Sequence, residues 1–504
     1  MFKLGEFIIV TLSLLFISCG KAEFDYEQLL NTKKMEKDFI STWTVGDPSL
    51  GDGDLSITLP LRSGFNYDFT VDWGDGSESS ISSDSDPKAT HNYSVAGTYT
   101  VKISGTAEAL YFNCSGDYQK IQTVSNLGAL GWKSLERAFA CTENLQISLS
   151  GEAPELTTVN NMFEDAINID VDIKDWKTES LNNSERLFYN SDGLTLDVDK
   201  WEVAAGTNFT SACGNAENFS IDVVKWDFGT GSDLTSFFKN TNNSTIQGSF
   251  DVKGATSLSY MFDNARNISI DTSSWDTSSA TDMSFMFYYV SWTPDTTNWN
   301  TSNVTNMRRV FAFSDANPDV SNWDVSKVED MTRMFSNATS ATPDTSSWTT
   351  TSLTNLDGMF SYASSANPDT RGWDVSKVTI MRNLFEYAVN ANPDTSLWDT
   401  SMVGSMEGMF LGASSADPVM SSWDFSSIQL LEDIFRGMTL STTNYDTFLI
   451  RLNTTGPSSP PIPFPGMNSF HGGGSKYTAG GAAASARNNL DTNGWVITDG
   501  GSTP

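Results

Sequence analysis

A tryptophan-based repeat constrains the fold of this chain more than any other feature of its sequence. Seven Trp residues recur at steps of 24 or 25 residues, and a Phe follows each of them twelve residues later. The residues are Trp275, Trp299, Trp323, Trp348, Trp373, Trp398 and Trp423, followed by Phe287, Phe311, Phe335, Phe360, Phe385, Phe410 and Phe435. A fixed period of this length is typical of a solenoid, in which stacked turns bury apolar faces that a single turn leaves exposed.

The Phe position extends the repeat toward the N-terminus. It continues back to Phe139, with Cys213 in place of Phe in one repeat. Thirteen such positions predict about 13 turns within residues 139–440. Phe250 and Gly151 occupy the Trp position in two of the less regular repeats. We expect the Trp and Phe side chains to form the buried core of the array.

The first half of each turn is predicted to be a short strand. Ile169, Val171 and Ile173 alternate with polar residues before Trp176, which is the period-2 pattern of a half-buried strand. In the turns spanning 294–418, Pro stands within this segment, as at Pro318. Because Pro lacks a backbone N–H donor, we expect those turns to be extended rather than fully paired.

The second half of each turn is predicted to be a short helix. Ser326 is a candidate N-cap, and the apolar residues after it recur at helical spacing. These residues are Val328, Met331, Met334, Phe335 and Ala338. The methionines are expected to fill the core rather than to bind a metal.

A row of aspartates is the candidate site within the array. An Asp stands four residues before most of the Trp residues and is predicted to point outward: Asp271, Asp295, Asp319, Asp344, Asp369 and Asp394. Stacked about 4.8 Å apart, such carboxylates repel by about 1 kcal/mol per neighbour in water. Either hydrogen bonds within each turn or bound cations such as Ca²⁺ would offset this repulsion. We therefore predict that the row binds a ligand or cations. The sequence assigns no definite metal site.

The N-terminus reads as an export signal. Residues 1–19 contain Lys3, an apolar stretch from Phe7 to Ile17, and then Ser18 and Cys19. The apolar stretch is too short to span a bilayer as a helix. This region resembles a bacterial lipobox, which implies lipidation at Cys19 and a membrane attachment through that lipid; an ordinary signal peptide is the alternative. Residues 20–41 are predicted to be a tether with a weak helix.

Residues 42–105 are predicted to be a small β domain. Tyr67 to Trp73 alternates apolar and polar residues, and Gly97 to Ile103 does the same. The combination of Trp73, Gly74, Asp75 and Gly76 with His91 and Tyr93 resembles a PKD domain. That resemblance implies an Ig-like β-sandwich, an extracellular setting, and structural roles for these six residues.

The remaining segments are predicted to cap the solenoid. Residues 106–138 lead into the array, with strands near 109–113 and 121–124 and a helix near 133–140. Residues 441–504 break the period, and they are predicted to contain helices at 445–452 and 479–490, a Pro-rich loop at 456–465 and a final strand at 494–499. The predicted fold class is therefore mainly β with short helices: an Ig-like sandwich, a leucine-rich-repeat-like solenoid of about 13 turns and a C-terminal cap.

Charge and residue usage exclude several functions. The formal net charge is −32, from 30 basic and 62 acidic residues, and such a surface repels nucleic acid. The chain has two His residues, which leaves little material for His-based catalysis or metal binding. Cys213 is expected to be a buried thiol, whereas Cys114 and Cys141, about one repeat apart, are candidates for a disulfide between adjacent turns.

The repeat also resembles a known family. Trp323-Asp324-Val325-Ser326 followed by Val328, Met331, Met334 and Phe335 resembles the BspA-like leucine-rich-repeat surface proteins of bacteria and the related mycoplasma lipoprotein repeats. The resemblance implies an exported, lipid-anchored protein at the bacterial outer membrane or cell surface. It implies which residues of the repeat form the core, but it assigns no residue a role in binding.

The sequence therefore predicts an adhesion or ligand-binding module. Its partner would be an extracellular protein or glycan bound along the polar face of the solenoid, with no catalysis and no nucleic acid. A structural spacer or coat protein is the first alternative. A polysaccharide-active β-solenoid enzyme is the second, although the regular turns show no irregular acidic pair.

Overall fold

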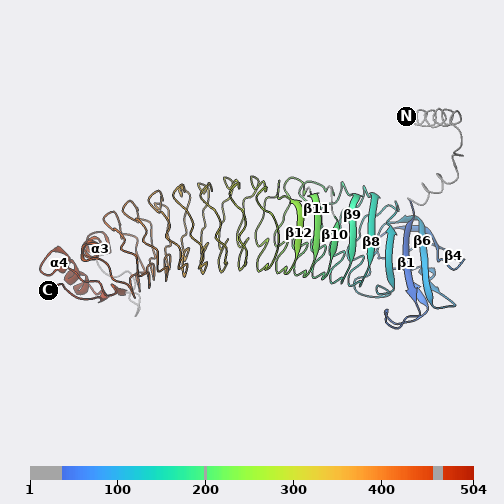
Figure 1. Cartoon of the computed structure of the whole chain (residues 1–504), viewed down its shortest axis with the longest axis horizontal. Coiled ribbons are helices and arrows are strands. Elements are labelled where there is room, and N and C mark those ends of the chain that lie inside the picture. Colours follow the sequence, from blue (N-terminus) through green and yellow to red (C-terminus); the bar gives the residue numbers. More distant parts are fainter. Residues whose placement is uncertain (1–36, 198–200, 202, 227, 458–468) are drawn as a thin grey trace, which may run out of the picture.

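The computed structural model describes residues 37–197, 201, 203–226, 228–457 and 469–504. This part of the chain is mainly β and winds into a β-solenoid of about 14 turns. Figure 1 shows a long, gently curved array, with an antiparallel sheet at its N-terminal end and two helices, α3 and α4, at its C-terminal end. Cys19 and the predicted tether helix lie outside the described residues, apart from the last residues of that helix.

The N-terminal unit is a small antiparallel sheet with a second, two-stranded sheet beside it. Its elements are β1 (Phe39–Val45), β2 (Ser56–Thr58), β3 (Tyr67–Asp72), β4 (Glu78–Ile81), the 3-10 helix η1 (Pro87–Ala89), β5 (Thr90–Asn92) and β6 (Gly97–Ala107). β1, β6, β3 and β4 pair in that order, and β2 pairs with β5. The alternation predicted for Tyr67 to Trp73 is confirmed, since Tyr67, Phe69, Val71 and Trp73 are buried. β1 begins at Phe39, slightly before the predicted start of the domain.

The N-terminal sheet continues directly into the solenoid. β1 pairs on its second side with β7 (Ile121–Asn126), and β7 pairs in parallel with β8 (Gln146–Glu152). One ten-stranded sheet therefore runs from β4 to β12. The N-terminal unit covers the first edge of the solenoid, where exposed backbone groups would otherwise pair with another chain.

The early turns contain the predicted strands. These are β8, β9 (Asp170–Lys177), β10 (Thr195–Asp197), β11 (Ser220–Trp226) and β12 (Thr245–Phe250), all paired in parallel. The register places Gly151 opposite Trp176 and Phe250 opposite Trp226. The two irregular repeats are thus aligned as the Trp spacing predicts.

Regular strands end at β12, and proline enters the repeat after one further turn. Between β12 and the C-terminal cap, the described chain has no strand, and Pro recurs at Pro294, Pro318, Pro343, Pro368, Pro393 and Pro418. Side chains replace the lost backbone ladder. The Asn317 Oδ1 atom accepts a hydrogen bond from the N–H of Thr342 (2.8 Å), and Asn367 Oδ1 accepts one from the N–H of Asn392 (2.9 Å). The prediction of extended, incompletely paired turns is confirmed.

The predicted helix in the second half of each turn is wrong. Residues 331–338 form successive tight turns, because the N–H groups of Met334, Ser336 and Ala338 each donate to the carbonyl oxygen three residues earlier. Between these, alternate N–H groups donate to the next turn of the solenoid, as from Phe335 to Met359 O (2.9 Å). Residues 133–140 likewise form turns rather than a helix, and 109–113 contributes only a β-bridge at Ala109.

The solenoid has one more turn than predicted. A column of parallel β-bridges links one residue per turn from Ala109 to Leu430, at 14 positions in the described chain. The extra turn contains Phe112, which precedes Phe139 by 27 residues rather than by 24 or 25. The motif Phe-x-Cys, at Phe112 and again at Phe139, marks the two turns as equivalent.

Aromatic columns fill the core. The seven Trp residues of the regular repeat are buried, as are the Phe residues that follow them. Adjacent Phe rings stack nearly parallel, as do Phe335 and Phe360, whose centroids are 5.6 Å apart with an interplanar angle of 2°. Trp275 and Trp299 stack in the same way at 5.7 Å. The Phe column is continuous from Phe287 to Phe435, with centroids 5.5–6.0 Å apart, and thus ties each turn to its neighbours.

The C-terminal segment caps the last turn. α3 (Thr442–Thr455) buries Tyr445, Phe448, Leu449 and Leu452, which is the face that the sequence predicts. Phe448 packs edge-on against Phe435 of the array. β13 (Ser469–His471), α4 (Ala482–Thr492) and β14 (Val496–Thr498) complete the cap, confirming the predicted second helix and final strand. The predicted Pro-rich loop lies mostly outside the described residues.

No helix in the described part of the chain has both the length and the apolar character needed to cross a bilayer.

Candidate functional site: two rows of side chains on the solenoid

The predicted aspartate row lies on the surface of the solenoid. Asp319 is exposed, whereas Pro318 and Val320 on either side of it are buried. Asp271, Asp295, Asp344 and Asp394 are also exposed, and Asp369 is half-buried. The structure therefore brings the six predicted residues together as one row, with one member per turn and the side chains outward.

Hydrogen bonds within each turn hold these carboxylates. The Oδ1 atom of Asp319 accepts the Ser321 N–H (3.0 Å) and the Ser321 hydroxyl (2.6 Å). The other five Asp residues each accept an N–H from the residue two positions later. These bonds hold the pKa values of Asp271, Asp319, Asp344 and Asp394 below the usual range, and Arg371 does the same for Asp369. Asp residues that close turns in this way are common in proteins.

Repulsion along the row is weaker than these hydrogen bonds. Asp344 has carboxylates on both sides, at Asp319 and Asp369, and both act to raise its pKa. The pKa of Asp344 is nevertheless lowered, because the hydrogen bonds from Ser346 outweigh the repulsion. Arg371 adds an ion pair with Asp369 at 2.5 Å. Hydrogen bonds within each turn thus offset the repulsion along the row, and Ca²⁺ binding to it stays a prediction.

A second row of the same kind supports a structural role. One residue after six of the seven Trp residues of the regular repeat, an Asp or Asn side chain accepts the N–H two positions later, as Asp324 does from Ser326 (3.0 Å). Its other members include Asp276, Asn300, Asp374, Asp399 and Asp424. Asp residues in both rows thus close corners of the turn.

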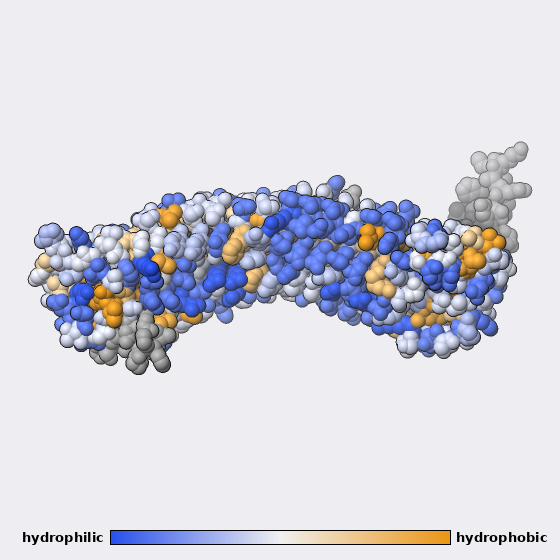
Figure 2. Space-filling view, turned by 90° about the horizontal axis from the view of Figure 1, so that it is seen from below, coloured by the Kyte–Doolittle hydropathy of each residue, from blue (hydrophilic) through white to orange (hydrophobic). Residues whose placement is uncertain are grey.

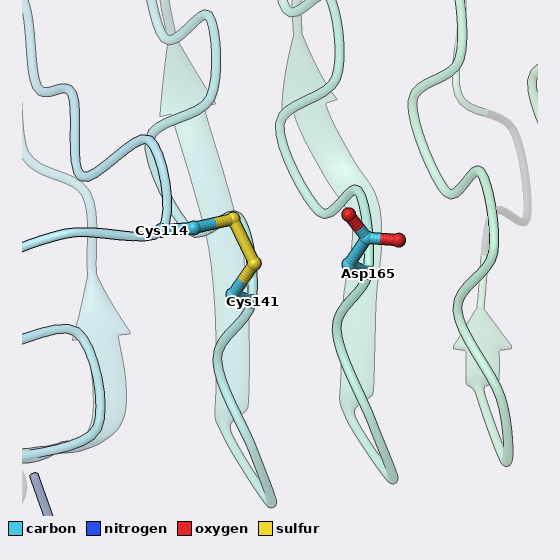
Figure 3. A group of neighbouring side chains, drawn as sticks. All are labelled: Cys114, Cys141 and Asp165. Carbon is cyan, nitrogen blue, oxygen red and sulfur yellow. A yellow bond between two sulfur atoms is a disulfide. The ribbon is translucent and has the colours of Figure 1, made fainter.

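A cluster of Cys114, Cys141 and Asp165 has the geometry of a metal site but is a disulfide. Within the described residues, these are the His, Cys or acidic side chains that gather three ligand atoms within 4.8 Å. Figure 3 shows the two sulfur atoms bonded to each other beside Asp165. The predicted disulfide between adjacent turns is confirmed, and its sulfurs are not thiolate ligands. Cys213 is a buried free thiol, as predicted, and burial raises its pKa.

The six residues of the predicted PKD motif pack as a structural group. His91 stacks on Trp73 (4.8 Å between centroids), and its Nε2 atom lies 2.9 Å from Asp75 Oδ2. Hydrogen bonds from Ser77 and His91 lower the pKa of Asp75 to about 2. The Tyr93 hydroxyl donates to Trp73 O (2.9 Å). Gly74 and Gly76 have positive φ angles, and a Cβ at Gly74 would lie 2.5 Å from the Thr100 carbonyl oxygen.

Lys120 forms the most buried ion-pair cluster outside the array. Its side chain is 1% exposed, and its amino group lies 2.6–2.8 Å from Asp52, Asp54 and Asp117. The hydrogen bond from Lys120 lowers the pKa of Asp54 to about 2. The amino group thus occupies the place that a cation would take among three carboxylates, and it ties two loops of the N-terminal unit together.

A row of aromatic and arginine side chains was not predicted. It lies along the tight turns on either side of the Phe column, over six successive turns. We call it the aromatic–arginine row; its members are Tyr260, Phe285, Tyr288, Tyr289, Phe313, Tyr362 and Tyr387, with Arg266, Arg308, Arg309, Arg333 and Arg382. None of these positions belongs to the apolar stripe that defines the repeat.

Contacts between neighbouring turns make the row continuous over most of its length. Tyr260 stacks on Phe285 (4.5 Å, 9°), and Tyr362 stacks on Tyr387 (4.9 Å). Tyr289 contacts Phe313 edge-on, and the Arg266 guanidinium lies 4.0 Å above the Tyr289 ring. Figure 2 shows one long face of the array that is mostly hydrophilic, with hydrophobic residues in small separate groups. Among the described residues, the aromatic side chains that are exposed all belong to this row: Tyr289, Phe313, Tyr362 and Tyr387.

Backbone conformation makes the aromatic residues unexpected. Six of the seven have positive φ angles of 50–60°: Tyr260, Phe285, Tyr289, Phe313, Tyr362 and Tyr387. Asn and Gly adopt this conformation at lower cost than bulky residues. Four of the six stand two residues after the repeat Phe, where other turns have Asn337 and Gly412. Tyr260 and Phe285 stand two residues before it, where other turns have Asn383 and Gly408. The fold therefore does not require an aromatic residue there.

Comparison with known proteins identifies the repeat. A model of one protein family matches residues 133–249, 221–315, 256–373, 289–396 and 354–452. Together these overlapping matches cover well over half of the chain. Neither the curated proteins nor the solved structures gave a match to the chain. The chain belongs to the family described as "Mycoplasma protein of unknown function, DUF285".

Proposed function

We propose that this protein is an exported surface lipoprotein that binds an extended extracellular partner along its solenoid. The observation that carries the proposal is the array itself, which repeats the same outward side-chain positions at every turn. Repeat arrays expose long continuous surfaces suited to extended partners. The partner is an extracellular protein or glycan, and the interaction is binding without catalysis.

Two features support export and anchoring. The signal and lipobox-like residues up to Cys19 predict a lipid anchor, and the Cys114–Cys141 disulfide is of the kind that persists in oxidising compartments. We therefore propose an outer-membrane or cell-surface location. A Cys19→Ala protein should no longer sediment with membranes; continued sedimentation would contradict the lipid anchor.

We include in this proposal the resemblance of the N-terminal unit to a PKD domain and of the repeats to the BspA-like surface proteins. Two small β-sheets around buried Trp73 support a PKD-like N-terminal domain. The buried Trp and Phe columns support a relationship to the BspA-like surface proteins. Both resemblances agree with a role outside the cell.

A structural spacer is the second candidate function. The hydrogen-bonded Asp rows favour it, because their carboxylates already have partners within the turn. A spacer needs length and stability rather than a ligand.

Attachment assays separate the two functions. Cells that carry the full chain should adhere to a matrix protein or glycan surface better than cells that lack it. The soluble chain without residues 1–19 should bind the same surface and compete with the cells. If the soluble chain binds none of a broad panel of matrix proteins and glycans, the spacer function is favoured instead.

A further inference from the structure

The aromatic–arginine row has the features of a ligand-binding surface. Resting on the binding function proposed above, we propose that this row, rather than the Asp row, contacts the partner, and that the partner is an acidic glycan carrying carboxylate or sulfate groups. The row covers six turns and thus five steps, roughly 24 Å at the strand spacing. That length suits a chain-like ligand rather than a small molecule.

Unusual backbone conformation is the first support. Aromatic residues occupy left-handed positions at Tyr289, Phe313, Tyr362 and Tyr387, although Asn337 shows that Asn fits the same site. Their exposed fractions are 42–43%, so burial does not compensate for this conformation. Backbone strain of this kind is concentrated at functional sites.

Uncompensated positive charge is the second support. Arg308 and Arg309 have no carboxylate partner within the described residues, and the Arg309 Nε atom is buried without a hydrogen bond. Burial lowers the pKa of Arg309, as do the neighbouring charges of Arg333 and Arg308. Arg333 and Arg382 both pair with Asp357, at 3.7 and 3.2 Å. The uncompensated charge of the row therefore lies at Arg308 and Arg309, in a chain with a net charge of −32. Acidic groups of a ligand would relieve this repulsion through charge-assisted hydrogen bonds.

The backbone of this surface restricts the kind of ligand. In the turn around Phe335, the N–H groups of Met331, Arg333 and Asn337 donate to the next turn, while those of Met334 and Ser336 close tight turns. A polypeptide added as a β-strand needs free backbone donors and acceptors along the binding edge. Recognition here depends on side chains alone.

Side-chain recognition by rings and guanidinium groups fits a glycan. The apolar C–H faces of sugar rings pack against aromatic side chains, and their carboxylate or sulfate groups pair with Arg, which binds such groups in bidentate fashion. The Arg309 guanidinium lies 5.4 Å from the centre of the Phe285 ring, and that of Arg266 lies 4.0 Å from the centre of the Tyr289 ring. The row thus brings apolar and cationic groups into contact with each other.

The binding test uses the soluble full-length chain without residues 1–19 and four probes. These are alginate as a polyuronate, dextran as a neutral glycan, polyglutamate as an acidic polypeptide, and single-stranded DNA. Titration calorimetry should show binding of alginate that weakens as salt is raised, with weak or no binding of the other three. Absence of alginate binding, or equal binding of polyglutamate or DNA, overturns the proposal.

Charge variants locate the site. The double substitution Arg308→Gln and Arg309→Gln should weaken alginate binding by about tenfold or more, because it removes two charges at the contact. Arg371→Gln is the matched control: it removes an exposed Arg from the Asp row, and alginate affinity should stay within about twofold. Equal losses in both proteins would indicate a non-specific charge effect and overturn the assignment.

Aromatic variants separate binding from folding. Tyr362→Asn and Tyr387→Asn replace strained aromatic residues with the residue that Asn337 shows is suitable. Melting temperatures should be unchanged or higher, whereas alginate binding should weaken about tenfold. A lower melting temperature together with unchanged binding would show that the rings serve the fold. These variants could leave alginate binding unchanged while cell adhesion still requires the protein. The proposed binding function would then stand, and the partner would contact a different surface of the solenoid.

Discussion

At the scale of single residues, Asp319 shows how the array tolerates a line of carboxylates. Its side chain accepts two hydrogen bonds from Ser321 and remains exposed. Asp319→Ala should lower the free energy of unfolding by about 1 kcal/mol or less, because exposed hydrogen bonds contribute little. Asp319→Asn keeps the acceptor and should be near neutral. Urea denaturation of both variants measures the difference, and a loss of several kcal/mol would contradict the outward position.

Hydrogen bonding of these carboxylates sets a pH dependence. The folded-state pKa values of Asp271, Asp319, Asp344 and Asp394 lie below the unfolded value near 3.9. Their contribution to stability is thus complete above about pH 4 and is lost as the pH falls through the folded-state values. Thermal melts between pH 7 and pH 2.5 should show a falling melting temperature only at the acidic end. A melting temperature that rises on acidification would contradict this assignment.

The buried tryptophans carry far more stability than the aspartates. Trp323 stacks on Trp299 (6.2 Å, 6°) and packs against Phe311. Trp323→Ala should cost about 3–5 kcal/mol. Because each turn contacts only its neighbours, hydrogen exchange should accelerate mainly in the adjacent turns. Leu397→Ala is the control, since Leu397 is 76% exposed and its loss should leave exchange unchanged.

At the scale of one turn, buried Thr hydroxyls partly replace the sheet that proline prevents. The Thr345 hydroxyl donates to Asp369 O in the next turn (2.7 Å), and Val320 occupies the equivalent position one turn earlier. Thr345→Val should cost about 1 kcal/mol by removing that bond, while the shape still fits. Val320→Thr, the reverse change, should be neutral or stabilising. Chemical denaturation of the pair tests this, and an equal loss in both would show that shape matters more than the bond.

The sequence predicts some elements well and others poorly, for identifiable reasons. The apolar spacing of Tyr445, Phe448, Leu449 and Leu452 predicts α3, and the Ser441 side chain caps its start by accepting a hydrogen bond from the Asn444 N–H. The same kind of spacing at residues 328–338 does not indicate a helix, because successive tight turns also place apolar residues every three or four positions. Asn337, with its positive φ angle, is the local signal that favours turns over a helix.

The aromatic–arginine row could not be recognised from the repeat pattern alone. Its residues vary from turn to turn, whereas a repeat is found from what stays the same. Once the turns are aligned, the sequence does contain a signal for this row. Tyr362 and Tyr387 stand at a position with a positive φ angle, where other turns have Asn337 and Gly412. The Asp row, by contrast, is evident in the sequence because it repeats, and it repeats because an Asp side chain closes the same corner in each turn.

At the scale of the whole molecule, the disulfide secures the N-terminal end of the array. Cys114 and Cys141 occupy equivalent places in the first two turns and close a loop with a sequence separation of 27. Replacing both with Ser should lower stability by about 3–4 kcal/mol in the chain-entropy model. Hydrogen exchange should then rise first in β7 and β8. Unchanged protection of these strands would show that the N-terminal sheet alone secures this end.

The direction of the turn-to-turn hydrogen bonds has a mechanical consequence. Bonds such as that from Phe335 to Met359 lie along the long axis, so a pull on the two ends loads successive turns in series. A turn that occupies about 5 Å when stacked releases about 85 Å of chain when it opens. The turn between Cys114 and Cys141 is covalently bypassed and cannot lengthen. Under tension, the molecule would therefore extend stepwise while its N-terminal end stays intact, as a load-limiting tether does.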